Sequence, residues 1–401
     1  MAREFGVMVA GCLCIDIIPR FPDTGASALG EIVRPGKLVV MGPAKVSTGG
    51  PVSNTGVNLK TLGENVCFCA RIGDDDFGAL TLDYLKASGS ADGIRVVPGD
   101  ISSHTIVIAP PNIDRSFLHH PGSNNLFGPA DVQQDLVERC RIFHFGYPPI
   151  MRRIYENEGE GLRDLFRIAK EAGATTSCDM SLPDPDTDGG KAPWMTILEK
   201  VLPYVDIFLP SIEEAFYAVE PEAFFKMKAE HNGAELIDHF TAADYTRIAD
   251  KLLELGCKMT ALKSGHRGFY FKTGSSTSFD AMGAAPPGDP DAWSERELWC
   301  PAFSAPNLAS ATGSGDSAIA GFLAAYLRGL SLEECLKVAN CTGWQNVQEL
   351  DAISGVGDWD RTAELLAQKM PMNDVRITTP GWTWSDVHEL WAGPEDPLSG
   401  A

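Results

Sequence analysis

A glycine-rich turn leads into an apolar helix in the last third of the sequence. The turn, Ala311-Thr-Gly-Ser-Gly-Asp-Ser317, is followed by apolar residues at helical spacing. The start of a helix leaves backbone N–H groups free and favours negative charge, so Gly313, Ser314 and Gly315 can form an anion hole for a phosphoryl group. Asp316 can accept the proton of an attacking hydroxyl. The alternative is an ordinary glycine turn in which Asp316 caps the helix.

A second glycine-rich segment, Gly49-Gly-Pro-Val-Ser-Asn54, precedes a helix that ends at Leu62-Gly63. After the next expected strand comes Arg71-Ile-Gly-Asp-Asp-Asp-Phe-Gly78. Two glycine motifs in a fixed order are more specific than either one alone. In both regions the sequence resembles the ribokinase family, also called the PfkB carbohydrate kinases. The first signature has a Gly-Gly pair, an Asn four residues later and Gly-x-Asp-x-Phe-Gly, and the second ends in Gly-x-Gly-Asp, here at Asp316.

The resemblance covers about Gly6 to Gly355 and implies ATP-dependent phosphorylation of a hydroxyl on a small sugar or related polyol. The substrate contacts that it implies are Asp16, Gly49, Gly50, Asn54, Arg115 and Asn124. Carboxylate and amide groups suit a polyol, because its hydroxyls need several oriented partners. The alternatives are a turn at the end of a strand for Asp16 and a solvated loop for Arg115.

The same resemblance implies ATP as the nucleotide and Mg²⁺ as the metal. The nucleotide-binding positions of the family are matched by Lys263, Gly265, Gly268 and Asn340. Asp206-Ile-Phe-Leu-Pro-Ser-Ile-Glu-Glu-Ala215 is similar to the family's Pro-Asn-x-x-Glu segment, in which the Glu, here Glu214, helps to place Mg²⁺ and phosphate. Without this context, residues 263–268 would be a hairpin turn, and Glu214 an acid favoured by a helix dipole.

The sequence departs from the family pattern at several serines. Ser211 stands for the motif's Asn, Ser181 for the Asn of Asp-x-Asn, and Ser310-Ala311 for an Asp-Thr pair that helps to hold a monovalent cation. These changes weigh against activation by potassium and indicate an outlying branch.

A nucleoside kinase of the same fold, and a ligand-binding or regulatory homologue with impaired catalysis, are open alternatives. No P-loop, H-E-x-x-H or G-x-S-x-G motif occurs.

Composition limits the class of protein. The 401 residues are 44% hydrophobic and 22% charged, as in ordinary globular enzymes. A formal charge of −21 disfavours a nucleic-acid partner and an anionic membrane surface. The ten cysteines show no C-x-x-C spacing, so we expect buried, reduced thiols. No apolar run is long enough to span a bilayer, which predicts a cytoplasmic location.

Apolar strand-like runs alternate with segments of helical period, which predicts an α/β fold with a mostly parallel sheet. Strands are expected at residues 7–13, 142–145, 175–178, 207–209, 259–262 and 268–271, and helices at 53–62, 161–172, 243–255 and 317–327. The resemblance makes this a ribokinase-like three-layer αβα sandwich with a small β lid, and lids of this family often pair into a homodimer. We expect a core of residues 1–16, 49–99 and 125–371, lid segments at 17–48 and 100–124, and a Trp-rich C-terminal extension at 372–401.

Overall fold

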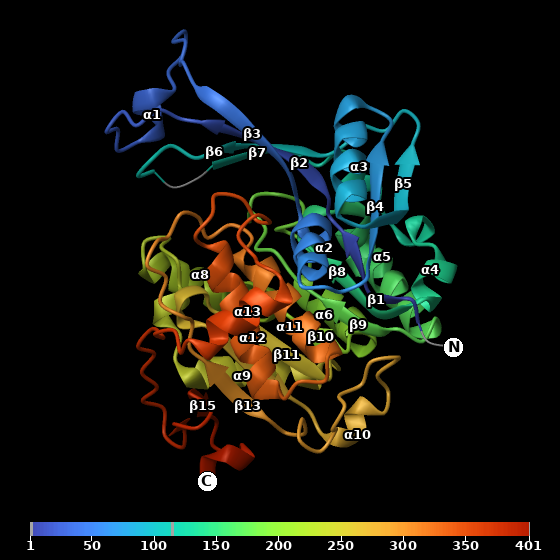
Figure 1. The fold of residues 1–401 in the computed structure, drawn as a ribbon, viewed down its shortest axis with the longest axis vertical. Helices are drawn as coiled ribbons and strands as arrows, with labels where there is room; N and C mark the ends of the chain where they lie inside the picture. The colour runs from blue at the N-terminus through green and yellow to red at the C-terminus, as the bar shows by residue number, and fades with distance from the viewer. Residues whose placement is uncertain (1–2, 114–115, 401) are drawn as a thin grey trace.

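A large sheet runs through the middle of the molecule (Figure 1). The computed structural model describes residues 3–113 and 116–400. Its main sheet has eleven strands in the order β14-β15-β13-β12-β11-β10-β9-β8-β1-β4-β5. Neighbours from β5 to β11 are parallel, and those from β11 to β14 are antiparallel. The strands are β1 (Phe5–Gly11), β4 (Val66–Gly73), β5 (Ser90–Val97), β8 (Cys140–Gly146), β9 (Thr175–Cys178), β10 (Ile207–Phe208), β11 (Met259–Lys263), β12 (Phe269–Thr273), β13 (Glu297–Cys300), β14 (Thr383–Ser385) and β15 (Leu390–Ala392).

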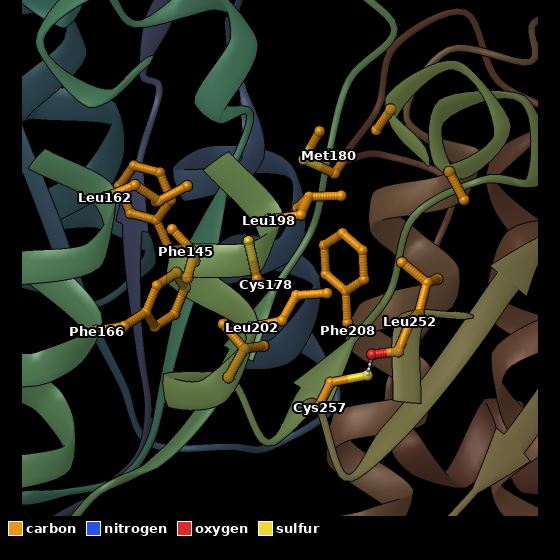
Figure 2. Packing of buried hydrophobic residues seen from close by; sticks show 14 of the residues in the cluster. Phe145, Leu162, Phe166, Cys178, Met180, Leu198, Leu202, Phe208, Leu252 and Cys257 are labelled. Carbon is orange, nitrogen blue, oxygen red and sulfur yellow. Dashed lines mark hydrogen bonds between the residues drawn. The ribbon is translucent and has the colours of Figure 1, made fainter. Parts of the chain in front are cut away.

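Helices cover both faces of this sheet, because its strands are apolar on both sides. In β1, Met8 and Ala10 belong to one buried cluster with α5, α6, α7 and α9, whereas Val7 and Val9 belong to the other with α2, α11 and α12. Figure 2 shows part of the first cluster, in which Phe145 of β8 meets Phe166 of α5 edge-on. The helices are α1 (Leu29–Ile32), α2 (Pro51–Thr61), α3 (Asp76–Ser88), α4 (Gln134–Glu138), α5 (Arg152–Glu171), α6 (Trp194–Val201), α7 (Ile212–Val219), α8 (Pro221–Glu230), α9 (Ala242–Glu254), α10 (Ser276–Phe279), α11 (Ser314–Leu327), α12 (Leu332–Asn346) and α13 (Trp359–Ala367).

The α/β class with a mostly parallel sheet between helix layers is confirmed. All of the strands and helices that we expect from the sequence are present, with shifted ends. The largest shift is in α5, which begins at Arg152 rather than near Gly161. Its backbone leaves the helical region over residues 156–159, so the sequence pattern found only the regular part of this element.

A second, four-stranded sheet lies apart from the main sheet (Figure 1). Its order is β3-β2-β6-β7, from β2 (Cys14–Arg20), β3 (Gly42–Gly49), β6 (His104–Ile108) and β7 (Ser116–His120). These strands come largely from the two segments expected to form the lid. An ion pair between Lys45 of β3 and Asp351, a buried residue after α12, ties this sheet to the core. That the sheet closes over a substrate stays a prediction.

The C-terminal segment extends the main sheet. Strands β14 and β15 pair with each other, and β15 pairs with β13, which places Trp391 opposite Trp299. Asp396, fully buried, accepts hydrogen bonds from Arg296 Nε and from the backbone N–H of Glu297, both at 2.9 Å. Arg296 also donates to Glu333 of α12 at 2.6 Å. One buried guanidinium therefore joins the C-terminal segment, the start of β13 and a covering helix.

All ten cysteines lie within the described residues, are buried and are free thiols, as the spacing predicts. Desolvation raises the pKa of several of them, for example to about 12 for Cys257, so these thiols stay protonated. Across residues 3–113 and 116–400, no helix combines the length and the apolar character needed to cross a membrane.

We predict that Arg296→Ala lowers the free energy of unfolding by about 3–5 kcal/mol, because the buried carboxylates of Asp396 and Glu333 lose their cation. Urea unfolding followed by circular dichroism measures this loss. Arg376→Ala is the control, since Arg376 and Asp374 form an exposed ion pair worth less than about 1 kcal/mol. A loss for Arg296→Ala no larger than that of the control would contradict the anchoring role.

Candidate active site

Asp316 lies in the first turn of α11, 2% exposed, directly after the glycine-rich turn. Its carboxylate oxygen Oδ2 accepts hydrogen bonds from Asn54 Nδ2 at 3.0 Å and from the Tyr147 hydroxyl at 2.7 Å. Thr55 Oγ1, one residue further along α2, lies 3.4 Å from Oδ1. The structure thus joins the two signature regions through a direct contact between Asn54 and Asp316.

Burial raises the pKa of Asp316 above that of an ordinary Asp. Hydrogen bonds from Asn54 and Tyr147 and the positive charge of Lys263 act in the opposite direction and offset part of the rise. A carboxylate with a raised pKa binds a proton more tightly than one in water, and this is the property required of a general base.

The turn before Asp316 depends on two glycines. Gly313 has φ 75° and caps α11, and a Cβ at this position would overlap the side chain of Ala352. At Gly315, a Cβ would lie 3.3 Å from Cε of Lys263. The absence of side chains leaves the helix start open to a cavity of about 450 Å³, which Asp316, Gly313, Ser314 and Gly315 line.

A second cavity, of about 480 Å³, lies on the other side of the turn. It shares Lys263, Gly265, Ser314 and Gly315 with the first cavity, so the two meet at the start of α11. Its further lining is largely apolar and includes Phe303, Leu308, Ala339, Trp344 and Val347. Such a lining suits a flat ring system, and the shared turn suits a chain of phosphates.

Gly268 and Asn340 also line the second cavity. Gly268 has φ 95°, and a Cβ there would overlap the backbone carbonyl of Cys300. Asn340 donates from Nδ2 to the carbonyl oxygens of Cys300 and Pro301, at 2.9 and 3.2 Å. These residues shape the cavity wall, and the amide nitrogen of Asn340 is already engaged by the backbone.

Lys263, at the end of β11, is the cation of the site. Its Nζ donates to Asp179, which follows β9, and to the carbonyl of Leu209 at 2.7 Å, and lies 4.0 Å from Oε2 of Glu214. Burial opposes the charge on Lys263, but the neighbouring carboxylates outweigh it and raise its pKa. Burial raises the pKa of Asp179 as well, although Lys263 opposes that rise. Lys263 therefore stays protonated.

Glu214 helps to cap the N-terminus of α7, the helix in which it lies. In α7, the Ser211 backbone N–H donates to Glu214 Oε2 at 2.6 Å, and the Glu214 N–H donates to Ser211 Oγ at 3.2 Å. This reciprocal pair is a capping box. The hydroxyl that replaces the family's Asn is thus part of the helix cap, while Glu214 still lines the first cavity. No three His, Cys, Asp or Glu side chains of the described residues converge into a metal site of their own.

Asp16 lies in the second sheet, where it pairs with Ser47 of β3 and Thr105 of β6. The Cys14 thiol donates to Oδ1 of Asp16 at 3.3 Å, and burial raises the pKa of Asp16. A Cβ on Gly49 would overlap the Asp16 carboxylate. Gly50 has φ 81°, and a Cβ there would lie 2.5 Å from the carbonyl oxygen of Cys12. The glycine pair therefore lets the chain pass beside Asp16 and turn into α2.

Asn124 is buried, and both ends of its amide are engaged within the protein. Its Oδ1 accepts from the Leu13 backbone N–H at 3.2 Å, and its Nδ2 donates to Cys12 Sγ at 3.2 Å. These bonds hold the link between β1 and β2, which lies three and four residues before Asp16. Contact between Asn124 and a substrate stays a prediction, and Arg115 lies outside the described residues.

The sequence alone did not identify Tyr147 or Thr55 as site residues, and it noted Asp179 only as the Asp of the family's Asp-x-Asn segment. Tyr147 and Asp179 directly follow the parallel strands β8 and β9. In open α/β sheets, ligands bind at the carboxyl ends of the strands, and this rule is the signal that could have found them.

Comparisons with known proteins show the family and the fold. Residues 11–358 match the family model described as "pfkB family carbohydrate kinase". An uncharacterized sugar kinase of Archaeoglobus fulgidus is 22% identical over 300 residues, 75% of this chain and 98% of the relative. Fructokinase-2 of Solanum habrochaites is 29% identical over 174 residues, 39% of this chain, and the alignment spans only 52% of that enzyme.

A ribokinase of Arabidopsis thaliana, solved with ribose and ATP, has the same fold, with a TM-score of 0.65, 19% identity and coverage of 91% of this chain and 99% of that one. The family match and the fold together define a carbohydrate kinase that uses ATP. The chain belongs to the PfkB carbohydrate kinase family.

If Asp16 binds the sugar, as the resemblance implies, Gly49→Ala should raise the KM for the sugar by about 10-fold or more, because the new methyl group would displace the Asp16 carboxylate. Steady-state kinetics with each substrate varied in turn measures this, and the KM for ATP should hardly change. Gly30→Ala is the control, since a Cβ at Gly30 meets open space. An unaltered sugar KM in Gly49→Ala would show that Asp16 does not hold the substrate.

Proposed function

We propose that this chain transfers the terminal phosphoryl group of ATP to a hydroxyl of a small sugar or related polyol, with Asp316 as the general base. The observation that supports this most directly is the place of Asp316. Its buried carboxylate lines one cavity at the point where a second, largely apolar cavity begins. An alcohol in the first cavity and a nucleotide in the second would meet at the turn before α11.

Asp316 takes the proton of the acceptor hydroxyl, the hydroxyl oxygen forms a bond to the terminal phosphorus, and the bond between that phosphorus and the bridging oxygen of ADP breaks. The backbone N–H groups of Gly313, Ser314 and Gly315 hold the charge that gathers on the phosphoryl oxygens. Lys263, which lies next to the carboxylates of Asp179 and Glu214, adds a positive charge near the transferred phosphoryl group.

In this proposal the sugar is bound by Asp16, Gly49, Gly50 and Asn54. The family resemblance adds Arg115 and Asn124 as further sugar contacts. The nucleotide is bordered by Lys263, Gly265, Gly268 and Asn340. Glu214 fits a role in holding Mg²⁺, because its carboxylate lines the cavity and Mg²⁺ commonly takes one or two carboxylates together with phosphate oxygens. Bound there, Mg²⁺ would neutralise phosphate charge.

The second sheet acts as the lid. Asp16 and Lys45 lie on the same face of this sheet, because Lys45 is opposite Ile18, which is two residues after Asp16. Lys45 also forms an ion pair with Asp351 of the core. Closure against the core would exclude water, which otherwise competes with the sugar as acceptor. Strands β3 and β7 form the two edges of the described lid sheet, and pairing of two lids through such an edge is our proposal for a homodimer.

Asp316→Asn should lower kcat at least about 1,000-fold, because the amide neither accepts the proton nor carries the negative charge of the carboxylate. The affinity for ATP should hardly change. A coupled assay of ADP release measures turnover, and isothermal titration calorimetry measures ATP binding. The panel of acceptors should include sugars and nucleosides, because a nucleoside kinase shares this fold.

Turnover of Asp316→Asn equal to that of the wild type would refute the base assignment. ATP binding by the wild type without phosphate transfer to any acceptor in the panel would favour a regulatory or ligand-binding role. Preference for nucleosides over sugars would replace the acceptor class but keep Asp316 as base.

A further inference from the structure

Tyr147 has a backbone conformation that its residue type rarely adopts. It directly follows β8 and has φ 65° and ψ 48°, in the left-handed region. Pro148 and Pro149 come next and begin a short 3-10 turn. Residues held in such conformations persist where the surrounding structure determines them, and they cluster at functional sites.

This conformation directs the phenol of Tyr147 to the Asp316 carboxylate. The hydroxyl lies 2.7 Å from Oδ2, the shortest of the hydrogen bonds described for that carboxylate, and Asn54 donates to the same oxygen at 3.0 Å. An ionised carboxylate has about four lone-pair sites, so these two bonds leave room for an acceptor hydroxyl. Tyr147 also lines the same cavity as Asp316.

We propose that Tyr147 is a positioning residue whose hydroxyl fixes the Asp316 carboxylate and keeps it in the ionised form that accepts a proton. The inference rests on the proposed function, in which Asp316 is the base. A hydrogen bond to the ionised form stabilises that form over the acid, and here it opposes the cost of burial. Asn54 and Thr55 supply the other donors to the carboxylate.

Other ionisable groups face Asp316 from several elements. Lys263 at the end of β11 favours the ionised form, whereas the carboxylates of Asp179 after β9 and Glu214 of α7 repel it. Cys12, before β2, stays a thiol, since burial raises its pKa. Of these ionisable groups in the described residues, Tyr147 is the neutral one that donates a hydrogen bond to the Asp316 carboxylate.

Tyr147→Phe tests the inference through the pH dependence of kcat. Without the phenol hydroxyl, the pKa of Asp316 should rise, so activity should appear only at higher pH. A hydrogen bond to a charged group corresponds to a shift of about one to two pH units in the acid limb. Above that limb, the activity of the variant should approach that of the wild type. A loss of activity that is the same at every pH would overturn the inference.

Tyr326→Phe is the matched control. Tyr326 lies on α11 like Asp316, and its buried hydroxyl donates to the carbonyl of Ala285 at 2.8 Å, far from the cavities. Loss of the Tyr326 hydroxyl should leave the acid limb unchanged.

Tyr147→Asn is a second test variant, because Asn tolerates the left-handed conformation and lacks the phenol. It should shift the acid limb in the same direction as Tyr147→Phe, and an unshifted limb in both would overturn the inference.

A measurement that needs no turnover separates this inference from the proposed function. In protein labelled with [4-¹³C]aspartate, the signal missing from Asp316→Asn identifies the Asp316 carboxyl. Its titration midpoint should lie higher in Tyr147→Phe than in the wild type and Tyr326→Phe. Coincident midpoints would overturn the inference. Absence of phosphate transfer by the wild type would instead contradict the proposed function, while the midpoints would still decide the role of Tyr147.

Discussion

The site depends on keeping one carboxylate charged inside the protein. Asp316 is almost fully buried at the start of α11, and removing a carboxylate from water is costly unless donors or a cation replace the lost hydration. Three separate elements supply that replacement. Helix α2 provides Asn54 and Thr55, the end of β8 leads to Tyr147, and the end of β11 carries Lys263. Both the parallel sheet and the start of α2 are needed to bring these groups to one point.

That convergence requires backbones to approach closely where β1, β8 and α2 meet. A Cβ on Gly11 would overlap the carbonyl of Gly146, and a Cβ on Gly146 would overlap Pro51 in the first turn of α2. The glycines let α2 begin against the ends of two strands, and this places Asn54 beside the residue that follows β8. The packing of the first turn of α2 and the hydrogen bonds of Asp316 are therefore parts of the same arrangement.

Much of this was predictable from the sequence, and the remainder has identifiable physical reasons. The buried strands and the helix after Asp316 follow from local apolar period, and Asn54 and Asp316 lie in motifs of consecutive residues. Tyr147 has no local motif, because its role comes only from contacts with residues far away in the chain. Asp179 is the Asp of the Asp-x-Asn segment, but the sequence does not show that it contacts Lys263. Strands β14 and β15 each have three residues, too short to show an alternating pattern. Asn124 is expected to contact substrate and Ser211 departs from a motif, but the sequence cannot show that the polar atoms of both residues also bond within the protein.

The charges around the cavity also bear on the form in which a nucleotide can enter. Lys263 is surrounded by three carboxylates, those of Asp179, Glu214 and Asp316, and burial raises the pKa of each of them because the charged form loses contact with water. A bare polyphosphate would add further negative charge to this group, on a chain whose formal charge is already −21. A nucleotide that arrives with a divalent cation would bring compensating charge and could use the Glu214 carboxylate. From the charges of the described residues, we propose that the metal–nucleotide complex, rather than the free nucleotide, is the species that binds.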